Sequence, residues 1–308
     1  MEAPDFDLEN LFSIFENSIT DKIESKNYDE FLIAYSGGID STALLYFSKK
    51  IARKLDKKIK AIHVNHNLNK ESIEWEKHCS NFCKDIEVPL IIKNLNIVMH
   101  KGDSIEEIAR KDRYKSICDE INIKTVMMTA HHMEDQAETF LYQLLRGAGA
   151  KGLSSMPEIK KYNNGYHIRP FIKFSKKNLE NIVQHSNLDY VFDTSNNDIN
   201  FSRNFIRKSI FPIIEKKWPS YASTISRSAN NLSELVKLND DLAKIDIKEY
   251  LLEDINKINL NVKNLDSYGK TRIYGFLAER FMSYWFKKNT NYKMLPIIFY
   301  DIRDNLNK

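Results

Sequence analysis

Two polar clusters in this sequence combine residue types that bind phosphate groups. The first comprises six consecutive residues: Ser36, Gly37, Gly38, Ile39, Asp40 and Ser41. Its glycines let a ligand approach bare backbone, and Asp followed by Ser and Thr is favoured at the start of a helix. A helix start offers unpaired N–H groups and the positive end of the helix dipole. We therefore expect residues 36–41 to form a phosphate-binding loop.

The second cluster lies between residues 129 and 139 and contains His131, His132, Glu134 and Asp135. A carboxylate that faces a nucleotide phosphate suits Mg²⁺, which keeps several waters and takes one or two protein oxygens. The H-x-x-x-D spacing also suggests a transition metal, but no cysteine and no third histidine stands at ligand spacing. A polar cap at the start of a helix is a further interpretation.

Two pairs of arginines are spaced so that each pair shares one face of a helix. Arg110 and Arg113 are three residues apart, and Arg203 and Arg207 are four apart. Guanidinium groups suit phosphate oxygens, and arginine, asparagine and aromatic residues together are typical of RNA-binding surfaces. Each pair taken alone is also typical of a solvated helix face.

The segments that must position these residues alternate between strand and helix. Apolar runs predict strands at 31–35, 59–64, 90–98 and 125–130, and a short fifth at 167–171. Helical periodicity predicts helices at 8–23, 41–55, 70–86, 104–121 and 134–146. This alternation indicates an α/β fold with a doubly wound parallel sheet, which binds ligands beyond the carboxyl ends of its strands. Both polar clusters follow strands and should meet in one crevice.

Composition indicates a globular cytoplasmic protein with two domains. The 308 residues are 42% hydrophobic and 29% charged, no apolar run approaches a membrane span, and three cysteines fit a reducing compartment. We predict a catalytic domain over residues 1–214 and a smaller all-helical domain over 215–308. Residues 201–308 hold 19 basic and 12 acidic residues, a net charge of +7. Residues 1–200 hold 27 basic and 30 acidic residues, a net charge of −3. This asymmetry fits either a polyanionic partner or a lysine-rich solvated surface.

The order of the motifs resembles that of the tRNA(Ile)-lysidine synthetase family, whose ATP-pyrophosphatase loop is called the PP-loop. The P-loop pattern G-x-x-x-x-G-K-[ST] and the dinucleotide pattern G-x-G-x-x-G are absent. The resemblance is close over residues 28–215 and rests on Tyr-Ser-Gly-Gly-Ile-Asp-Ser, Ala-Arg-x-x-Arg-Tyr, Thr-Ala-His-His-x-x-Asp-Gln-x-Glu-Thr, Arg-Gly-x-Gly-x-x-Gly-Leu, Ile-Arg-Pro-Phe and Arg-Asn-x-Ile-Arg. Glu134 departs from the usual Asp, so we assign the metal role to Asp135.

The resemblance implies an adenine nucleotide alpha-hydrolase-like, Rossmann-like fold and a reaction in two steps. ATP first adenylates the C2 oxygen of the wobble cytidine in a CAU-anticodon tRNA(Ile), and free L-lysine then displaces AMP through its ε-amine. Residues 36–41 and His63 are the implied ATP contacts, and Asp40 and Asp135 the implied Mg²⁺ ligands. The implied catalytic residues are Asp40, Arg110, Arg113, His131 and Asp135. Either His131 or His132 would accept the lysine proton.

The implied tRNA contacts are Arg169, Arg203, Asn204 and Arg207. No membrane partner is expected, and a homodimer is compatible with the assignment. Two alternatives stay open: another PP-loop enzyme, such as a tRNA thiolase or an amide-forming synthetase, and a non-catalytic nucleotide-binding protein. Cys79 and Cys83 are four residues apart on an expected helix, unlike the C-x-x-C pairs of iron–sulfur thiolases.

Overall fold

A computed structural model describes residues 7–23, 26, 28–65, 71–95, 105–192 and 201–248, without the side chains of 105–107, 109–111 and 243–248. The chain divides into two compact units, Met1–Asn230 and Asn231–Lys308. The sequence motifs all lie in the first unit, and the predicted boundary at residue 214 stays a prediction. None of the described helices is long and apolar enough to cross a membrane.

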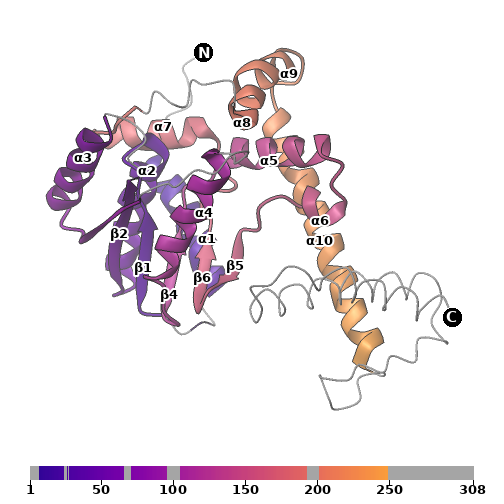
Figure 1. Cartoon of the computed structure of the whole chain (residues 1–308), viewed down its shortest axis with the longest axis horizontal. Helices are drawn as coiled ribbons and strands as arrows, with labels where there is room; N and C mark the ends of the chain where they lie inside the picture. The colour runs from indigo at the N-terminus through magenta and orange to yellow at the C-terminus, as the bar shows by residue number, and fades with distance from the viewer. Residues whose placement is uncertain are drawn as a thin grey trace. The chain divides into compact units, whose positions relative to one another are not determined.

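A six-stranded sheet forms the centre of the first unit (Figure 1). Its strands are β1 (Glu30–Ala34), β2 (Lys58–Asn65), β3 (Leu90–Asn94), β4 (Thr125–Met128), β5 (Ile159–Tyr162) and β6 (Gly165–Ile168), in the order β3-β2-β1-β4-β6-β5. All neighbours are parallel except β5 and β6. Ile33 of β1 pairs with Ala61 of β2 on one side and with Met128 of β4 on the other. The polar clusters that follow β1 and β4 therefore start side by side.

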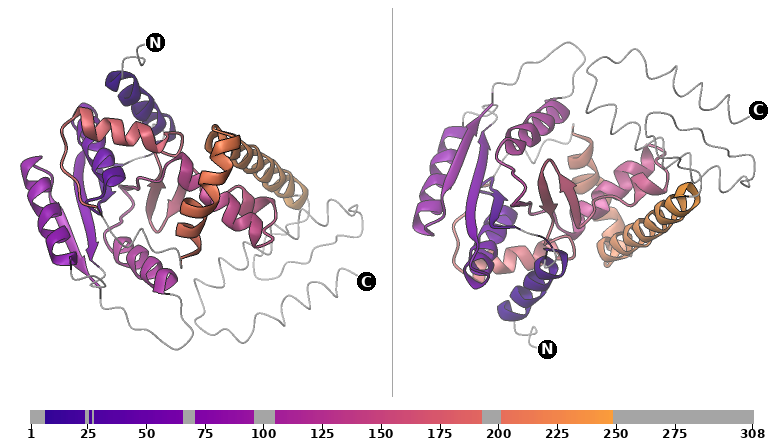
Figure 2. Two further views of the ribbon diagram at one scale, coloured as in Figure 1. Left: turned by 90° about the horizontal axis from the view of Figure 1, so that it is seen from above. Right: turned by 90° about the horizontal axis from the view of Figure 1, so that it is seen from below.

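Helices cover both faces of the sheet, as a doubly wound fold requires, and Figure 2 shows α1 and α7 on the side opposite α4. One core packs against α1 (Leu8–Ile23), α2 (Ile39–Lys54), α3 (Ser72–Asp85) and α7 (Lys176–His185), and the other against α4 (Ile105–Cys118). Phe31 and Ile33 of β1 belong to the first core and Leu32 to the second, all fully buried. Burial on both faces explains the continuous apolar run of β1.

The hairpin of β5 and β6 differs from the sequence prediction. The strand expected at 167–171 ends at Ile168, because the chain turns there and the backbone N–H of Ile172 donates to the carbonyl of Arg169. Pro170 could not continue the ladder, since it has no N–H group. β5 was not predicted, because it is an antiparallel edge strand with the sequence Ile-Lys-Lys-Tyr and two exposed lysines.

A smaller core joins α5 (Met133–Leu145) to the segment after residue 200. That segment forms α8 (Ser202–Phe205), the π-helix η2 (Ile206–Ile210), α9 (Phe211–Lys217) and α10 (Tyr221–Lys248), and the short helix α6 (Ala150–Leu153) follows α5. Ala137 of α5 packs with Ile206, Phe211 and Ala222. The helix expected through 203–207 is therefore α8 continued by a π-helix. The predicted helical domain is helical over α9 and α10, and its residues after 248 lie outside the described part.

Gly165→Ala is expected to lower the free energy of unfolding by about 2 kcal/mol, because it overpacks the contact between β6 and β4. A Cβ at Gly165 would lie 2.2 Å from the carbonyl oxygen of Thr125 and 2.8 Å from that of Asn122. Gly149→Ala is the control, since a Cβ there meets no atom within 4 Å and φ is −74°. Urea unfolding monitored by circular dichroism measures both variants. Equal midpoints for the two would contradict the packing described.

Candidate active site

The loop at residues 36–41 has the geometry of an anion-binding turn. Gly37 has φ +84°, and a Cβ there would lie 2.9 Å from Val191 Cγ2 and 3.0 Å from Cys79 Sγ, so only glycine fits without strain. The Ser36 and Ser41 hydroxyls lie 3.1 Å apart, and Ser41 Oγ donates to the carbonyl of Gly38 at 2.9 Å. Helix α2 begins at Ile39 and directs its first N–H groups toward the loop.

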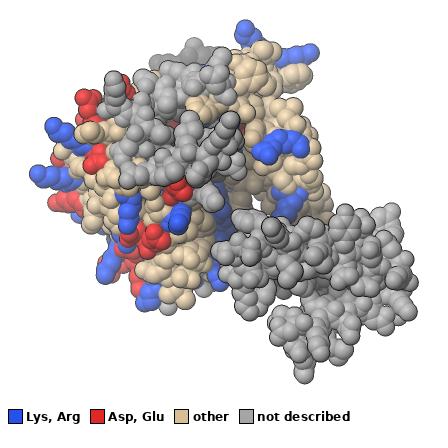
Figure 3. All heavy atoms as spheres, in the orientation of Figure 1, with Lys and Arg blue, Asp and Glu red and all other residues tan. Residues whose placement is uncertain are grey.

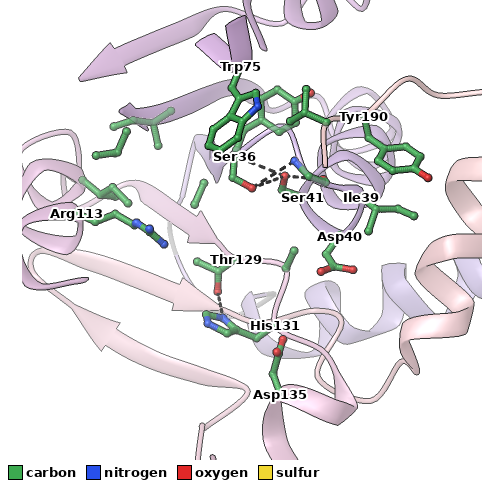
Figure 4. Close-up of a pocket in the computed structure, with 18 of the residues that line it drawn as sticks. Ser36, Ile39, Asp40, Ser41, Trp75, Arg113, Thr129, His131, Asp135 and Tyr190 are labelled. Carbon is green, nitrogen blue, oxygen red and sulfur yellow. Dashed lines mark hydrogen bonds between the residues drawn. The ribbon is translucent and has the colours of Figure 1, made fainter. Parts of the chain in front are cut away.

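A cavity of about 590 Å³ opens at the carboxyl ends of β1 and β4. This volume lies within the range of roughly 300–1,000 Å³ that is typical of small-molecule sites. Figure 4 shows Arg113 reaching in from one side, Tyr190 at the other, and Ser36, Ser41 and Asp40 between them. The predicted site residues that line the cavity are Ser36, Gly38, Ile39, Asp40, Ser41, Arg113, His131, Asp135 and Arg207.

Glu138 connects α5 to the arginines of the following segment. Its side chain is 2% exposed, and its two oxygens accept from Arg203 at 2.9 Å and from Arg207 at 2.7 Å. Arg207 also donates to Asp135 Oδ1 at 3.2 Å. Glu138 occurs in the second motif but received no role from the sequence. Its three-residue spacing from Asp135, which puts both carboxylates on one helix face, is the signal that could have found it.

His132 lies buried among three carboxylates. Its Nδ1 is 2.9 Å from Glu134 Oε2, and its Nε2 is 3.5 Å from Asp135 Oδ2 and 3.9 Å from Asp40 Oδ2. Burial acts to lower the pKa of His132. The charge of Asp135, the hydrogen bond with Glu134 and the charge of Asp40 outweigh this effect and raise the pKa to about 9. An imidazolium at this position compensates the charge of the acidic cluster, which makes His132 a structural cation of the site.

Asp40 and Asp135 fit the oxygen ligands of a magnesium ion. Asp40 Oδ1 is buried and has no hydrogen-bond partner among the described residues. Burial raises the pKa of the Asp40 carboxyl, His132 opposes this, and repulsion from Asp135 adds to it. Burial also acts to raise the pKa of Asp135, but His132, His131 and Arg207 hold it below its ordinary value. A divalent cation would satisfy the unpaired oxygen and relieve the repulsion between the carboxylates.

A chain of hydrogen bonds extends behind His131. Thr129 Oγ1 lies 2.7 Å from His131 Nδ1 and 2.8 Å from His167 Nε2, and His167 Nδ1 is 3.4 Å from a guanidinium nitrogen of Arg169. Arg169 is 3% exposed and donates to the carbonyl of Pro157 at 2.7 Å. The structure thus places Arg169 in the interior, behind His131, which is one of the two predicted proton acceptors. Its contact with tRNA stays a prediction.

His63, Arg110 and Asn204 are not among the described residues that line the cavity. His63 is buried beneath the loop, with Nδ1 3.0 Å from the carbonyl of Tyr35 and 3.5 Å from Cys79 Sγ, and burial lowers its pKa. The backbone of Arg110 belongs to α4, and its side chain lies outside the described part. Asn204 lies in α8. The ATP, catalytic and tRNA roles of these residues stay predictions.

The cysteines do not form a ligand set. Cys79 and Cys83 are buried free thiols on α3, and burial raises the pKa of each to about 12. In the described part of the chain, no group of three or more His, Cys, Asp or Glu residues is arranged to hold a metal ion.

A family model and the similar relatives that were found agree on the family of this chain. A PP-loop domain model matches residues 11–214. The tRNA(Ile)-lysidine synthase of Coxiella burnetii is 39% identical over 218 residues, which cover 71% of this chain and 49% of that protein. The tRNA(Ile)-lysidine synthase of Francisella tularensis subsp. holarctica is 35% identical over 281 residues, covering 90% and 67%. The chain thus spans between about half and two thirds of the length of these relatives.

A solved structure with the same fold is the U34-tRNA thiolase NcsA from Methanococcus maripaludis, which carries a [4Fe-4S] cluster. The TM-score is 0.60 at 16% sequence identity, with 85% of this chain and 87% of that chain covered. At this identity the likeness concerns the fold, which agrees with the predicted α/β class.

His132→Gln is expected to reduce the loss of stability at alkaline pH. Because its pKa is raised from about 6.5 to about 9, His132 stabilises the fold fully below pH 6.5, and this contribution disappears as the pH rises through about 9. The wild-type free energy of unfolding should therefore fall between pH 6.5 and 9 by on the order of 2 kcal/mol more than that of the variant. Urea unfolding at both pH values measures this, with His185→Gln on the exposed face of α7 as control. Parallel losses in wild type and His132→Gln would contradict the charged state assigned to His132.

Proposed function

Because this chain belongs to the tRNA(Ile)-lysidine synthase family of PP-loop proteins, we propose that it ligates lysine to the wobble cytidine of a CAU-anticodon tRNA(Ile). ATP supplies the energy, AMP and pyrophosphate are released, and the modified tRNA decodes AUA as isoleucine. The observation that carries this proposal is the cavity that joins the residue 36–41 loop to the acidic start of α5.

The loop supports cleavage of ATP between its α- and β-phosphates. The N–H groups at the start of α2 and the hydroxyls of Ser36 and Ser41 face the cavity, where they would hold the leaving pyrophosphate. Donors that are fixed before the reaction stabilise charge as it develops, without a cost of reorganisation. Arg113 enters from the opposite side and would contact the α-phosphate, with its planar guanidinium suited to phosphate oxygens.

Asp40 and Asp135 would hold Mg²⁺ in this proposal. When bound, the ion neutralises phosphate charge and orients the polyphosphate. The unpaired Oδ1 of Asp40 and the proximity of two carboxylates support this assignment. The backbone N–H of His132 donates to Asp135 Oδ2 at 3.1 Å, and His132 Nδ1 lies 2.9 Å from Glu134 Oε2, so both contacts hold the acidic cluster in place.

The tRNA would reach the cavity from the side of α8 and η2. Arg207 lines the cavity, with a side chain that is 42% exposed, and Arg203 and Asn204 precede it on α8. The wobble base must leave its stack to present its C2 oxygen. Figure 3 shows basic side chains over the region of α5, α6 and α9, and mixed charges over the sheet. Such a basic surface would attract the phosphate backbone of RNA.

The second step needs a neutral lysine amine, because the ordinary pKa of lysine is about 10.4. His131 lines the cavity, and its ring is oriented by the hydrogen bond to Thr129. We assign the proton to His131 rather than His132, since His132 is buried and enclosed by carboxylates and is not among the described residues that line the cavity. Thiolation, the alternative tRNA-modifying activity, is supported by fold alone.

Incubation of α-labelled ATP with tRNA(Ile) transcript and no lysine is expected to move the label onto the tRNA. Added lysine should then release the label as AMP. A transcript with uridine at the wobble position is the matched control and should stay unlabelled. Label in ADP, or label attached to lysine before tRNA, would contradict the proposal.

In the same assay, Asp40→Ala should slow labelling of the tRNA by roughly 100-fold or more, because it removes a charged group at the phosphate site. Asp21→Ala, an exposed carboxylate of α1 outside the cavity lining, should leave the rate unchanged. Equal urea midpoints will show that both variants fold. A folded Asp40→Ala protein with the wild-type rate would rule out the metal role of Asp40.

A further inference from the structure

We propose that Lys176 binds the β- and γ-phosphates of ATP and stabilises the charge of the departing pyrophosphate. This inference rests on the proposed function and adds a catalytic residue that the motifs did not identify. Lys176 is the first residue of α7 and lines the cavity together with Asp40 and Ser41. No sequence motif pointed to Lys176, because α7 was not among the predicted helices.

The backbone of Lys176 is fixed to the acidic cluster. Its N–H donates to Glu134 Oε2 at 2.9 Å, and the N–H of Met133 donates to the carbonyl of Phe174 at 2.8 Å. Ser175 caps α7, with Oγ accepting from the N–H of Asn178 at 3.2 Å. The first turns of α5 and α7 are therefore joined, and the Lys176 side chain starts from a defined position beside the phosphate loop. Glu134, which replaces the usual Asp of the motif, makes this connection.

The charge around Lys176 differs from that around the neighbouring Arg207. Arg207 donates to both Glu138 and Asp135, so two carboxylates already compensate its charge. The ammonium group of Lys176 forms no ion pair within 4.0 Å in the described part of the chain, although its charge lowers the pKa of Asp40. A flexible ammonium group that is exposed to the cavity is suited to bind mobile phosphate oxygens as a point charge.

The polarity of the cavity orients the nucleotide toward Lys176. Ala34, Ile62 and Met127 line the cavity and belong to one apolar cluster that packs against α4, so they form an apolar part of the lining. Lys176 and the first residues of α2 also line the cavity, and the charge of Lys176 acts on Asp40. An adenine ring prefers the apolar part and a triphosphate prefers the cationic part. This orientation brings the β- and γ-phosphates to the start of α2, within reach of the Lys176 side chain.

The chemical step leaves Lys176 unchanged. The C2 oxygen of the cytidine forms a bond to the α-phosphorus while the bond from that phosphorus to the bridging oxygen breaks. The electron pair of the broken bond leaves with pyrophosphate, which gains negative charge at the bridging oxygen. Lys176 forms no covalent bond in this step and contributes electrostatic stabilisation of that charge.

Binding of two nucleotides tests this role. Lys176→Ala should weaken the binding of α,β-methylene-ATP by 10- to 100-fold, because a hydrogen bond to a charged group contributes about 1.5–3 kcal/mol. Binding of AMP, which lacks the β- and γ-phosphates, should be unchanged. Lys176→Arg should restore most of the affinity for the analogue. The matched control is Lys177→Ala, because Lys177 is the next exposed residue on α7 and does not line the cavity.

Isothermal titration of the full chain with each nucleotide and Mg²⁺ gives these affinities without tRNA or lysine. Unchanged affinity of Lys176→Ala for the analogue would overturn the inference. So would an equal loss for the analogue and AMP, which indicates a structural effect on the whole cavity. The comparison requires only that the wild-type chain binds nucleotide. The tRNA-labelling assay described above decides the proposed function separately.

Discussion

The crevice depends on the balance of charge around three carboxylates at the starts of two helices. Asp40 comes from α2, and Asp135 and Glu138 come from α5. Unpaired carboxylates at this spacing would repel one another and become protonated. His132, Arg203 and Arg207 supply the compensating charges. The arginines belong to α8 and η2, so the same ion pairs that stabilise the acidic cluster also hold α8 and η2 against α5.

This arrangement makes the metal-binding and tRNA-binding predictions parts of one network. Arg207 contacts Asp135, a predicted magnesium ligand, and lines the cavity where the RNA base would enter. Removal of one partner from a buried ion pair commonly costs about 3–5 kcal/mol, because the other charge is left uncompensated. Substitutions at Glu138 or Arg203 will therefore affect stability and metal binding as well as RNA binding. Nucleotide affinity, tRNA affinity and unfolding must be measured together to separate these effects.

The sequence predicted the parts of the structure that follow from local pattern and parallel topology. The apolar run of β1, the glycine turn at Gly37 and the helix start at Asp40 are adjacent in the chain, so their joint structure is determined locally. The meeting of Asp40 with Asp135 follows from the pairing of β1 with β4. In each case a general rule for parallel sheets was sufficient.

Contacts between distant segments could not be predicted in this way. The π-helix at Ile206–Ile210 has no distinct sequence pattern, and it alters the spacing of the residues that follow Arg203. The burial of Arg169 depends on the hairpin of β5 and β6, whose edge strand resembles a polar loop. Lys176 was missed because its position depends on Glu134, 42 residues earlier in the chain. Such pairings result from tertiary packing, which overrides local preference.

The reaction proposed for this crevice is the transfer of adenylate to the C2 oxygen of a tRNA cytidine. It can be followed with a tRNA(Ile) whose wobble cytidine carries ¹⁸O at C2. After reaction with ATP and lysine, mass spectrometry of the released AMP follows the label. We expect AMP to carry the ¹⁸O, because this oxygen forms the bond to the α-phosphorus and leaves with it. Unlabelled AMP, with the ¹⁸O retained in the tRNA or released to water, would show that the C2 oxygen is not adenylated.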